Sequence, residues 1–393
     1  MSTIIDFTPF DFQGDVSAHT FKQFLKHCAD NNVSDILIQG GDYAWVEIHG
    51  RQRQASSHTI KQGQLSALIG SVWQAEVEIH IRAGDGADRS LEISGEELGI
   101  ERGKYLRFRC NFIQGRVARL DNAYAITMRL IPFDLPNILN MGIEEELFEA
   151  LYPGMGLGFV CGPTGSGKTT LQAGVYGYTG IQMPDRKVIT YEDPVEFVLG
   201  GPHWKGPQPH QAQVGRDIKS FAHGLRNAMR RKPGIVGIGE MRDLQTIDAA
   251  IEAGLTGHLT YGTMHTESVA ETINRAIQVY PPSQQSAIAS RLLGCLRFII
   301  VQRLLKTTDG KRQAIREFVI FDRELRNELQ AHSYENWPLL IRTQLEQQKA
   351  TLDDKAWALY EAGRIEKDEF IELAGHKAFR TSTLGRIHSQ EAV

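Results

Sequence analysis

The sequence predicts an α/β fold made of two domains and a helical C-terminal extension. Short apolar segments alternate with helical segments between residues 157 and 264, which is typical of a parallel sheet covered by helices on both faces. Pro132 and Pro136 precede this region and indicate a domain boundary near residue 135. From Leu325 onward the chain is charged and has helical spacing. We therefore expect a disordered leader (1–16), an N-terminal domain (17–131), a linker (132–140), a larger α/β domain (141–323) and the helical extension (324–393).

The N-terminal domain is expected to begin with an amphipathic helix, because apolar side chains recur at helical spacing from Ala18 to Cys28. Two alternating segments, Ser34–Gln39 and Trp45–Gly50, are bridged by glycines and an aspartate, which predicts a hairpin. Residues 60–83 have a helical pattern. The polar, glycine-bearing stretch 84–103 predicts a loop or a weak strand.

The last two strands expected in this domain carry three arginines on one face. In Tyr105–Asn111 and Ala125–Leu130 apolar residues alternate with polar ones, and the period of two puts the apolar set on one face of the sheet. The arginines on the other face are Arg107, Arg109 and Arg129. Two interpretations are open: an ordinary solvated face, or an arginine-lined sheet that is presented to an anion such as a nucleotide phosphate.

The larger domain contains a phosphate-binding loop that fits the pattern G-x-x-x-x-G-K-[ST] in full. Its residues are Gly162, Pro163, Thr164, Gly165, Ser166, Gly167, Lys168 and Thr169. An apolar strand precedes the loop, and a helix is expected from Lys168 to about Tyr178. Glycines let consecutive N–H groups curl around phosphate oxygens, and the helix dipole favours the anion. We expect Lys168 to reach the β- and γ-phosphates of a nucleoside triphosphate, Thr169 to bind Mg²⁺, and Thr170 to complete the contact set.

Three further strands end in polar side chains. Glu192 follows the strand 187–191, Glu240 follows the strand 235–239, and His265 follows the strand 259–264. Ligands of parallel sheets bind at the carboxyl ends of the strands, so these side chains and the loop are expected at one edge. The other segments expected here are helices at 142–151, 220–231, 244–253 and 284–305, a loop at 200–211 and a strand at 316–322.

The two acids suit the hydrolysis of a triphosphate. That reaction needs Mg²⁺ between the β- and γ-oxygens, and a group that orients or deprotonates the attacking water. We expect Glu240 to hold Mg²⁺ together with Thr169, and Glu192 to be the base that activates water, although the two roles can be exchanged. His265 is a candidate donor to the γ-phosphate, and His258 flanks the same strand as a second candidate.

The composition argues against several classes of protein. The formal net charge of −4 gives no general basic field, so direct nucleic-acid binding is not expected. The four cysteines are scattered, with no C-x-x-C pair and no metal-binding spacing. No apolar run reaches the ~18 residues of a membrane span, and the start of the chain does not resemble a signal peptide. We expect a cytoplasmic protein whose association with a membrane depends on protein partners.

Four motifs together resemble those of the secretion and pilus traffic ATPases, the type II/type IV secretion ATPase superfamily. Besides the phosphate-binding loop, Ile189–Phe197 is similar to their Asp box, Gly239–Asp243 to their Walker B motif and Thr256–Thr266 to their His box. Two further stretches, Arg226–Gly234 and Arg316–Asp322, resemble the DotB/TraJ-like ATPases of type IVB secretion and related plasmid conjugation systems. One departure is Lys232-Pro233-Gly234, where pilus retraction relatives usually have Asp-Pro-Asp.

The resemblance implies a PAS-like N-terminal α/β domain, a RecA-like P-loop ATPase domain, and a homo-hexamer that uses ATP and Mg²⁺. It also implies a motor at the cytoplasmic face of the inner membrane, where it energises assembly or substrate transfer by the components of a type IVB secretion or conjugation apparatus. One alternative is a type IV pilus retraction or assembly ATPase, which shares the same motifs. A RecA-like DNA translocase is disfavoured by the lack of a basic, aromatic-studded stretch. A scaffold that binds nucleotide without hydrolysing it is disfavoured by the intact Lys168, Glu192 and Glu240.

Overall fold

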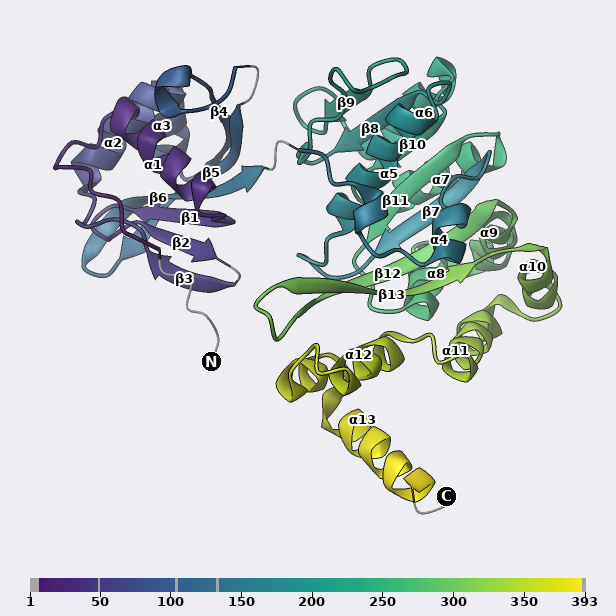
Figure 1. Cartoon of the computed structure of the whole chain (residues 1–393). Coiled ribbons are helices and arrows are strands. Elements are labelled where there is room, and N and C mark those ends of the chain that lie inside the picture. Colours follow the sequence, from purple (N-terminus) through teal and green to yellow (C-terminus); the bar gives the residue numbers. More distant parts are fainter. Residues whose placement is uncertain (1–6, 49, 103–104, 132–133, 391–393) are drawn as a thin grey trace. The chain divides into compact units, whose positions relative to one another are not determined.

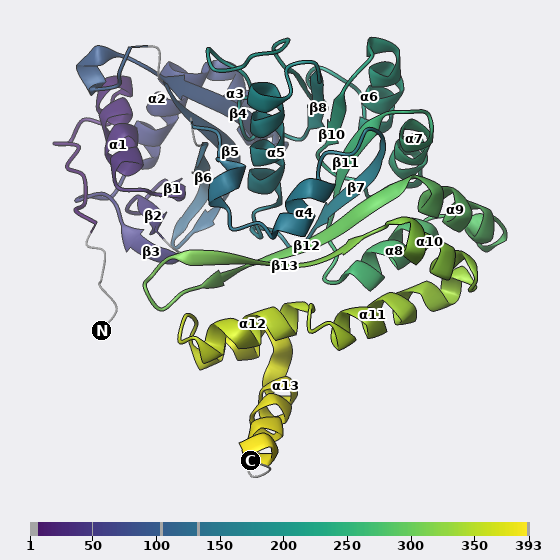
Figure 2. The same cartoon turned by 45° about the vertical axis from the view of Figure 1, so that its right-hand side comes forward.

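The structure is a computed structural model that describes residues 7–48, 50–102, 105–131 and 134–390. The chain divides into two compact units, Met1–Asp134 and Leu135–Val393 (Figures 1 and 2). The division falls inside the predicted linker 132–140, of which residues 132 and 133 lie outside the described part of the chain. Each unit has a hydrophobic core of its own.

The first unit is built on a six-stranded antiparallel sheet in the order β3-β2-β1-β6-β5-β4. Its strands are β1 (Asp35–Gln39), β2 (Trp45–Ile48), β3 (Arg51–Gln54), β4 (Ala87–Ile93), β5 (Leu106–Val117) and β6 (Leu120–Ile131). Its helices are α1 (Ala18–Asp30), α2 (Gln62–Trp73) and α3 (Ala75–Ala83), with a 3-10 turn, η1, at Glu96–Leu98. The helices and one face of the sheet share a core that includes Phe24, Leu65 and Phe108.

The elements predicted for this unit are present, with differences in detail. β1 and β2 form the predicted hairpin, in which Leu37 lies opposite Trp45. The helical stretch 60–83 is two helices, because Gln74 has a φ of 77° and interrupts the helical backbone. The polar stretch 84–103 contains a full strand, β4, paired with β5. β3 was not predicted, because an edge strand of sequence RQRQ has no apolar alternation.

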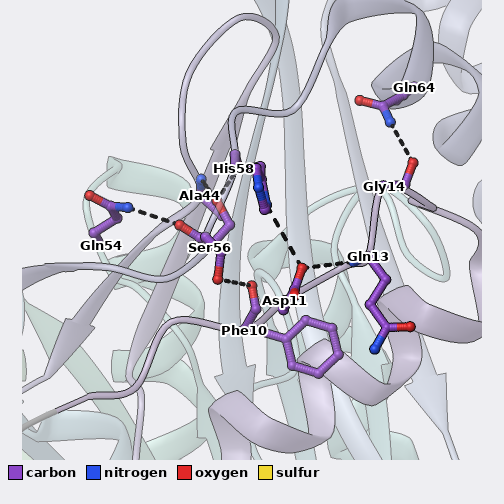
Figure 3. Close-up of polar contacts among 10 residues, drawn as sticks. Phe10, Asp11, Gln13, Gly14, Ala44, Gln54, Ser56, His58 and Gln64 are labelled. Atoms are coloured by element: carbon purple, nitrogen blue, oxygen red, sulfur yellow. Dashed lines mark hydrogen bonds and ion pairs between the residues drawn. The ribbon is translucent and has the colours of Figure 1, made fainter.

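Part of the predicted disordered leader is ordered against the first unit. Phe7 and Phe12 are buried in its core, and Phe10 packs against Phe12. The N–H of Phe10 donates to the carbonyl of Ala55, and the carbonyl of Phe10 accepts from the N–H of Ser57; Figure 3 shows further polar contacts of this segment. The prediction of disorder is therefore wrong for residues 7–16, because the burial of two aromatic rings and the packing of a third offset the entropy lost on ordering the segment. Residues 1–6 lie outside the described part of the chain.

The second unit contains a seven-stranded sheet in the order β13-β12-β7-β11-β10-β8-β9. Its strands are β7 (Gly156–Cys161), β8 (Val188–Glu192), β9 (His210–Gln213), β10 (Ile235–Ile238), β11 (Leu259–Met264), β12 (Leu296–Lys306) and β13 (Arg312–Ile320). All neighbouring pairs are parallel except β12–β13. The parallel sheet predicted from the alternation of strands and helices is therefore confirmed.

Helices cover both faces of this sheet. They are α4 (Glu145–Ala150), α5 (Lys168–Gln182), α6 (Phe221–Ala228), α7 (Leu244–Leu255), α8 (Val269–Gln278) and α9 (Pro282–Cys295), with 3-10 turns η2 (Ile138–Asn140) and η3 (Met229–Arg231). Phe159 and Val160 are adjacent on β7 yet lie in different cores, as the period of two of a strand requires. Two cores on opposite faces explain why every residue of β7, β10 and β11 is buried.

The expected helix 284–305 is helical only as far as Cys295. β12 begins at the next residue and pairs with β7 on one side and β13 on the other. Phe298, Ile299, Ile300 and Val301 are fully buried, and β-branched residues at consecutive positions suit a central strand. The prediction of one long helix is wrong because apolar runs of this length do not distinguish the two states by periodicity.

The predicted helical extension is present and packs on the second unit. It consists of α10 (Arg323–Gln330), α11 (Trp337–Gln347), α12 (Leu352–Glu361) and α13 (Lys367–Gln390), with a 3-10 turn, η4, at Tyr334–Asn336. Trp337 and Ile341 belong to the same core as α7 and α8. The buried carboxylate of Glu317 on β13 accepts from the first N–H groups of both α8 (2.9 Å) and α12 (3.4 Å). Within the described residues, no helix has both the length and the apolar character that a membrane span requires.

Candidate functional site

The phosphate loop joins the carboxyl end of β7 to the first turn of α5. Gly165 and Gly167 have φ values of 78° and 82°, a left-handed backbone that residues with a Cβ rarely adopt. The Oγ of Ser166 is buried in the loop and has no hydrogen-bond partner within the described residues. Thr169 is half-buried and Thr170 is exposed at the start of α5. A tight turn of this kind at a helix N-terminus, with an unpaired hydroxyl inside it, fits an anionic ligand.

Lys168 lies inside the loop. Its Nζ donates to the carbonyl oxygens of Gly162 (2.8 Å) and Pro163 (2.9 Å). Burial lowers the pKa of Lys168, and the charges of Glu196 and Glu240 oppose that shift. Because an ammonium group has three N–H donors, it can donate one N–H to a phosphate oxygen in addition to these two contacts.

Two of the predicted side chains meet beside the loop. β8, β10, β11 and β7 are parallel neighbours, so their carboxyl ends share one edge. Glu240 Oε1 lies 3.9 Å from His265 Nε2, and Glu240 Oε2 lies 3.6 Å from Arg242 Nη1. The N–H of Gly162 donates to the carbonyl of Met264, the residue before His265. The phosphate loop, Glu240 and His265 therefore belong to one site.

Glu192 ends β8 at the same edge, and two side chains donate hydrogen bonds to its carboxylate. Its Oε1 accepts from Thr190 Oγ1 (2.6 Å) and from Gln211 Nε2 (2.9 Å). Burial raises the pKa of Glu192, although these hydrogen bonds oppose the shift. A carboxylate with a raised pKa is a stronger base than an ordinary glutamate, which suits the activation of water. Gln211, at the end of the predicted loop 200–211, was not identified as a site residue from the sequence.

His265 has a pKa below its ordinary value. Burial is the largest cause, the nearby ammonium of Lys168 acts in the same direction, and the carboxylate of Glu240 acts against it. A lowered pKa favours the neutral imidazole near neutral pH. A neutral imidazole still carries one N–H, so His265 retains a donor for a phosphate oxygen.

Glu196 is a third carboxylate at this edge, and sequence reasoning missed it. It is half-buried, and its charge raises the pKa of both Lys168 and Glu192. The signal was available, since Glu196 follows Glu192 by four residues inside the stretch that resembles an Asp box. Glu196 is therefore a rival to Glu192 for the role of base.

The structure does not bring His258 to the loop. His258 precedes β11, whereas the site lies beyond the end of that strand at Met264. Six strand residues correspond to about 20 Å, and the carbonyl of His258 accepts from the N–H of Gly156 at the start of β7. Its assignment to the nucleotide site of this chain is therefore wrong. In a parallel sheet, a residue that flanks a strand lies at the ligand-binding edge only if it follows the carboxyl end of that strand.

The three arginines lie in the first unit on the face opposite its core, as predicted. Arg109 lies opposite Arg129 across β5 and β6. Nε of Arg107 is 3.4 Å from Oε1 of Glu92, and Nε of Arg129 donates to Oδ1 of Asp35 at 2.8 Å. The shared face is confirmed. Anion binding by this face stays a prediction.

The oxygen donors at this edge fit Mg²⁺. A magnesium ion in a nucleotide site takes one or two protein oxygens and completes its shell with phosphate oxygens and water. Thr169 is the residue after Lys168 in α5, and the half-buried Glu240 carboxylate lies just beyond the carboxyl end of β10, at the same edge of the sheet. These two groups would hold the ion.

Comparison with known proteins relates the chain to secretion and pilus proteins. The family model described as "Type II/IV secretion system protein" matches residues 20–356. The type IV pilus retraction ATPase PilT of Pseudomonas aeruginosa is 31% identical over 353 residues, which cover 90% of this chain and 97% of that protein.

Solved structures of two such ATPases have similar folds. The X-ray structure of the ATPase DotB of Legionella pneumophila superposes with a TM-score of 0.82 at 31% identity, over 94% of this chain and 98% of that one. The crystal structure of the pilus retraction motor PilT with bound ADP superposes with a TM-score of 0.75 at 30% identity, over 90% of this chain and 96% of that one.

Proposed function

The chain belongs to the type II/IV secretion system protein family and is an ATPase of that family; on this premise we propose that it is a hexameric motor whose ATP hydrolysis energises a type IVB secretion or conjugation apparatus. The motor drives assembly or substrate transfer from the cytoplasmic face of the inner membrane, where protein partners hold it. The observation that carries this proposal is the likeness to the ATPase DotB over nearly the whole length of both chains. The stretches Arg226–Gly234 and Arg316–Asp322, with their similarity to the DotB/TraJ-like ATPases, add to it.

In this proposal the two units of the chain have different roles. The first unit is PAS-like, in keeping with its six-stranded antiparallel sheet and three helices, and the second is RecA-like. ATP binds at the carboxyl edge of the second unit's sheet. Six copies form a ring, and the nucleotide state of each copy moves its first unit.

ATP binding depends on the phosphate loop. Its backbone N–H groups and the N-terminus of α5 attract the phosphate oxygens, and the glycines leave room for them. Lys168 is already held inside the loop by the carbonyls of Gly162 and Pro163, so its charge is in place before the phosphates arrive. Thr169 and Glu240 would hold Mg²⁺, which would supply positive charge against the phosphate oxygens when bound.

Hydrolysis requires a base for the attacking water. Glu192 takes a proton from this water as the water attacks, and hydrogen bonds from Thr190 and Gln211 hold the Glu192 carboxylate in one orientation. The neutral His265 donates to the γ-phosphate as negative charge develops there.

A second candidate function is type IV pilus retraction. The observation that favours it is the 31% identity to PilT over nearly the full length of both proteins. Against it, Lys232-Pro233-Gly234 stands before β10 where retraction relatives usually have Asp-Pro-Asp.

The two candidates differ in the process that stops when hydrolysis stops. Lys168→Ala removes a phosphate contact, and Lys219→Ala on the exposed surface is the matched control. Introduced into the native host, Lys168→Ala should abolish secretion or conjugative transfer and leave surface motility by pilus retraction unchanged. Loss of pilus retraction with normal transfer would establish the second candidate instead. If purified Lys168→Ala keeps about half or more of the wild-type turnover, the phosphate-loop assignment itself is wrong.

A further inference from the structure

One glutamine from a distant strand forms the back of the phosphate loop. Gln302 of β12 is 3% exposed, and its Nε2 donates to the carbonyl oxygen of Ser166 at 2.7 Å. A Cβ on Gly167 would lie 2.9 Å from that Nε2, and a Cβ on Gly162 would lie 2.3 Å from the backbone oxygen of Gln302. The backbone of Gln302 therefore leaves no room for a side chain at position 162, and a side chain at position 167 would push against the Gln302 amide.

Arg316 determines which way the amide of Gln302 points. The two residues are directly opposite on β12 and β13, Arg316 is 2% exposed, and its Nε donates to Gln302 Oε1 at 2.9 Å. A guanidinium only donates, so the amide oxygen must face it and the amide NH₂ must face the other side. On that other side is the Ser166 carbonyl, which only accepts. A neutral amide can bridge these two partners because it carries both an acceptor and a donor.

The hydrogen bond to Ser166 sets the direction of the next N–H group in the loop. The peptide bond between Ser166 and Gly167 is planar and trans, so its C=O and N–H point in opposite directions. A carbonyl held toward Gln302 directs the N–H of Gly167 away from Gln302, to the side of the loop on which phosphate binds. An aligned N–H is the group that holds a phosphate oxygen in such loops.

The same guanidinium holds the segment that follows the linker. Nη1 and Nη2 of Arg316 donate to the carbonyl oxygens of Gly142 and Met141, each at 3.2 Å. These residues directly follow η2, where the chain passes from the linker into the second unit. One buried side chain thus contacts both the amide behind the phosphate loop and the backbone at the end of the linker.

We propose that Gln302 and Arg316 are positioning residues for ATP hydrolysis, which align the Ser166–Gly167 peptide for phosphate binding and join the loop to residues 138–142. The inference rests on the ATPase function proposed above. Neither side chain touches the nucleotide; both act through the loop. Because these hydrogen bonds connect the loop to Met141 and Gly142, nucleotide bound in the loop restrains the segment 138–142 as well.

Gln302→Glu separates this role from a merely structural one. The new carboxylate still accepts from Arg316 but cannot donate to Ser166, and it places an acceptor against an acceptor. Affinity for a fluorescent, slowly hydrolysed ATP analogue should fall roughly tenfold or more, the scale of a lost hydrogen bond to a buried carbonyl. The KM for ATP should rise with it while kcat stays near that of the wild type, and the contact between the two acceptors should also lower the thermal midpoint. Gln313→Glu, the same change at a half-buried position on β13, is the matched control and should leave these quantities unchanged.

A purely structural role predicts a different pattern, in which the thermal midpoint and kcat fall together and KM stays constant. That pattern, or wild-type affinity and turnover in Gln302→Glu, would overturn the proposal. Wild-type protein that binds the analogue but releases no phosphate from ATP would refute the ATPase function and leave the binding comparison intact. The two failures are therefore distinguishable.

The link to residues 138–142 is tested on the wild-type protein, so it does not depend on how the variant folds. Hydrogen–deuterium exchange of peptides covering 138–143 should slow when the analogue is added. In Gln302→Glu saturated with the analogue, this slowing should be lost. Unchanged exchange in the wild-type peptides on saturation with the analogue would overturn the linkage.

Discussion

Replacing Glu192 by glutamine should separate nucleotide binding from hydrolysis. The amide oxygen of the glutamine can still accept from Thr190 Oγ1 and Gln211 Nε2, which lie 2.6 Å and 2.9 Å from Oε1 in the wild type. The amide cannot take a proton from water. Turnover should fall about 100-fold or more, or about 2.7 kcal/mol in the activation barrier, with ATP affinity unchanged.

The raised pKa of Glu192 adds two pH-dependent expectations. Below that pKa the carboxyl is protonated and cannot act as a base, so wild-type turnover should fall at a higher pH than an ordinary glutamate of pKa 4.5 would give. Glu192→Gln should lack this acid limb. Because the folded pKa lies above the unfolded one, the ionised carboxylate lowers stability above the folded pKa and has no effect below the unfolded pKa. Glu192→Gln should therefore be as stable as the wild type or more stable at neutral pH, and equally stable in acid.

Steady-state phosphate release across a pH series, with equilibrium binding of the analogue, measures these outcomes. Glu328→Gln, at an exposed position on α10, is the control and should match the wild type. Turnover of Glu192→Gln within about twofold of the wild type would refute the assignment of the base. If Glu196→Gln then shows the loss of turnover, the base is Glu196.

Three further outcomes are expected. Glu240→Gln should raise the Mg²⁺ concentration for half-maximal turnover roughly tenfold. An unchanged Mg²⁺ titration would exclude Glu240 as a metal ligand. A Glu240→Gln variant that keeps ATP bound without hydrolysing it would mean that Glu240 is the base and Glu192 the metal ligand. Alanine variants of the arginine face should lose the difference in ring assembly between the slowly hydrolysed analogue and ADP, and three variants that respond as the wild type does would make the face a solvated surface. The variants are Arg107→Ala, Arg109→Ala and Arg129→Ala. Glu317→Ala leaves the buried N–H groups of Val269 and Leu352, the first residues of α8 and α12, without their carboxylate acceptor, and should lower the free energy of unfolding by about 2–4 kcal/mol in chemical denaturation; an unchanged midpoint would mean that other groups satisfy both N–H groups.

Local patterns were sufficient for the parts of the site that lie within one strand–loop–helix segment. The phosphate loop was predicted because its glycines, Lys168 and Thr169 are consecutive in the chain. The edge that gathers Glu240 and His265 was predicted because parallel strands present their carboxyl ends together. The same rule, applied with the correct strand direction, would have excluded His258.

The predictions from sequence were wrong where a local pattern of residues is compatible with two different structures. The apolar run from Leu296 to Val301 satisfies a buried helix and a buried strand equally well, and only its pairing with β7 and β13 selects the strand. The phenylalanines of residues 7–16 are spaced by three and then by two residues, which matches neither the helical nor the strand period, and they become ordered only because a core lies beside them.

The sequence by itself determined the fold class of the second unit, the phosphate loop and the acids that follow its strands, because periodicity and motif spacing are properties of neighbouring residues. Only the tertiary structure decided what stands behind the loop. Gln302 lies 136 residues from Ser166 along the chain, and β12 and β13 bring it and Arg316 into contact with the loop and with residues 141–142. No local pattern encodes such a contact, since a buried amide that bridges a guanidinium and a carbonyl depends on which strands become neighbours.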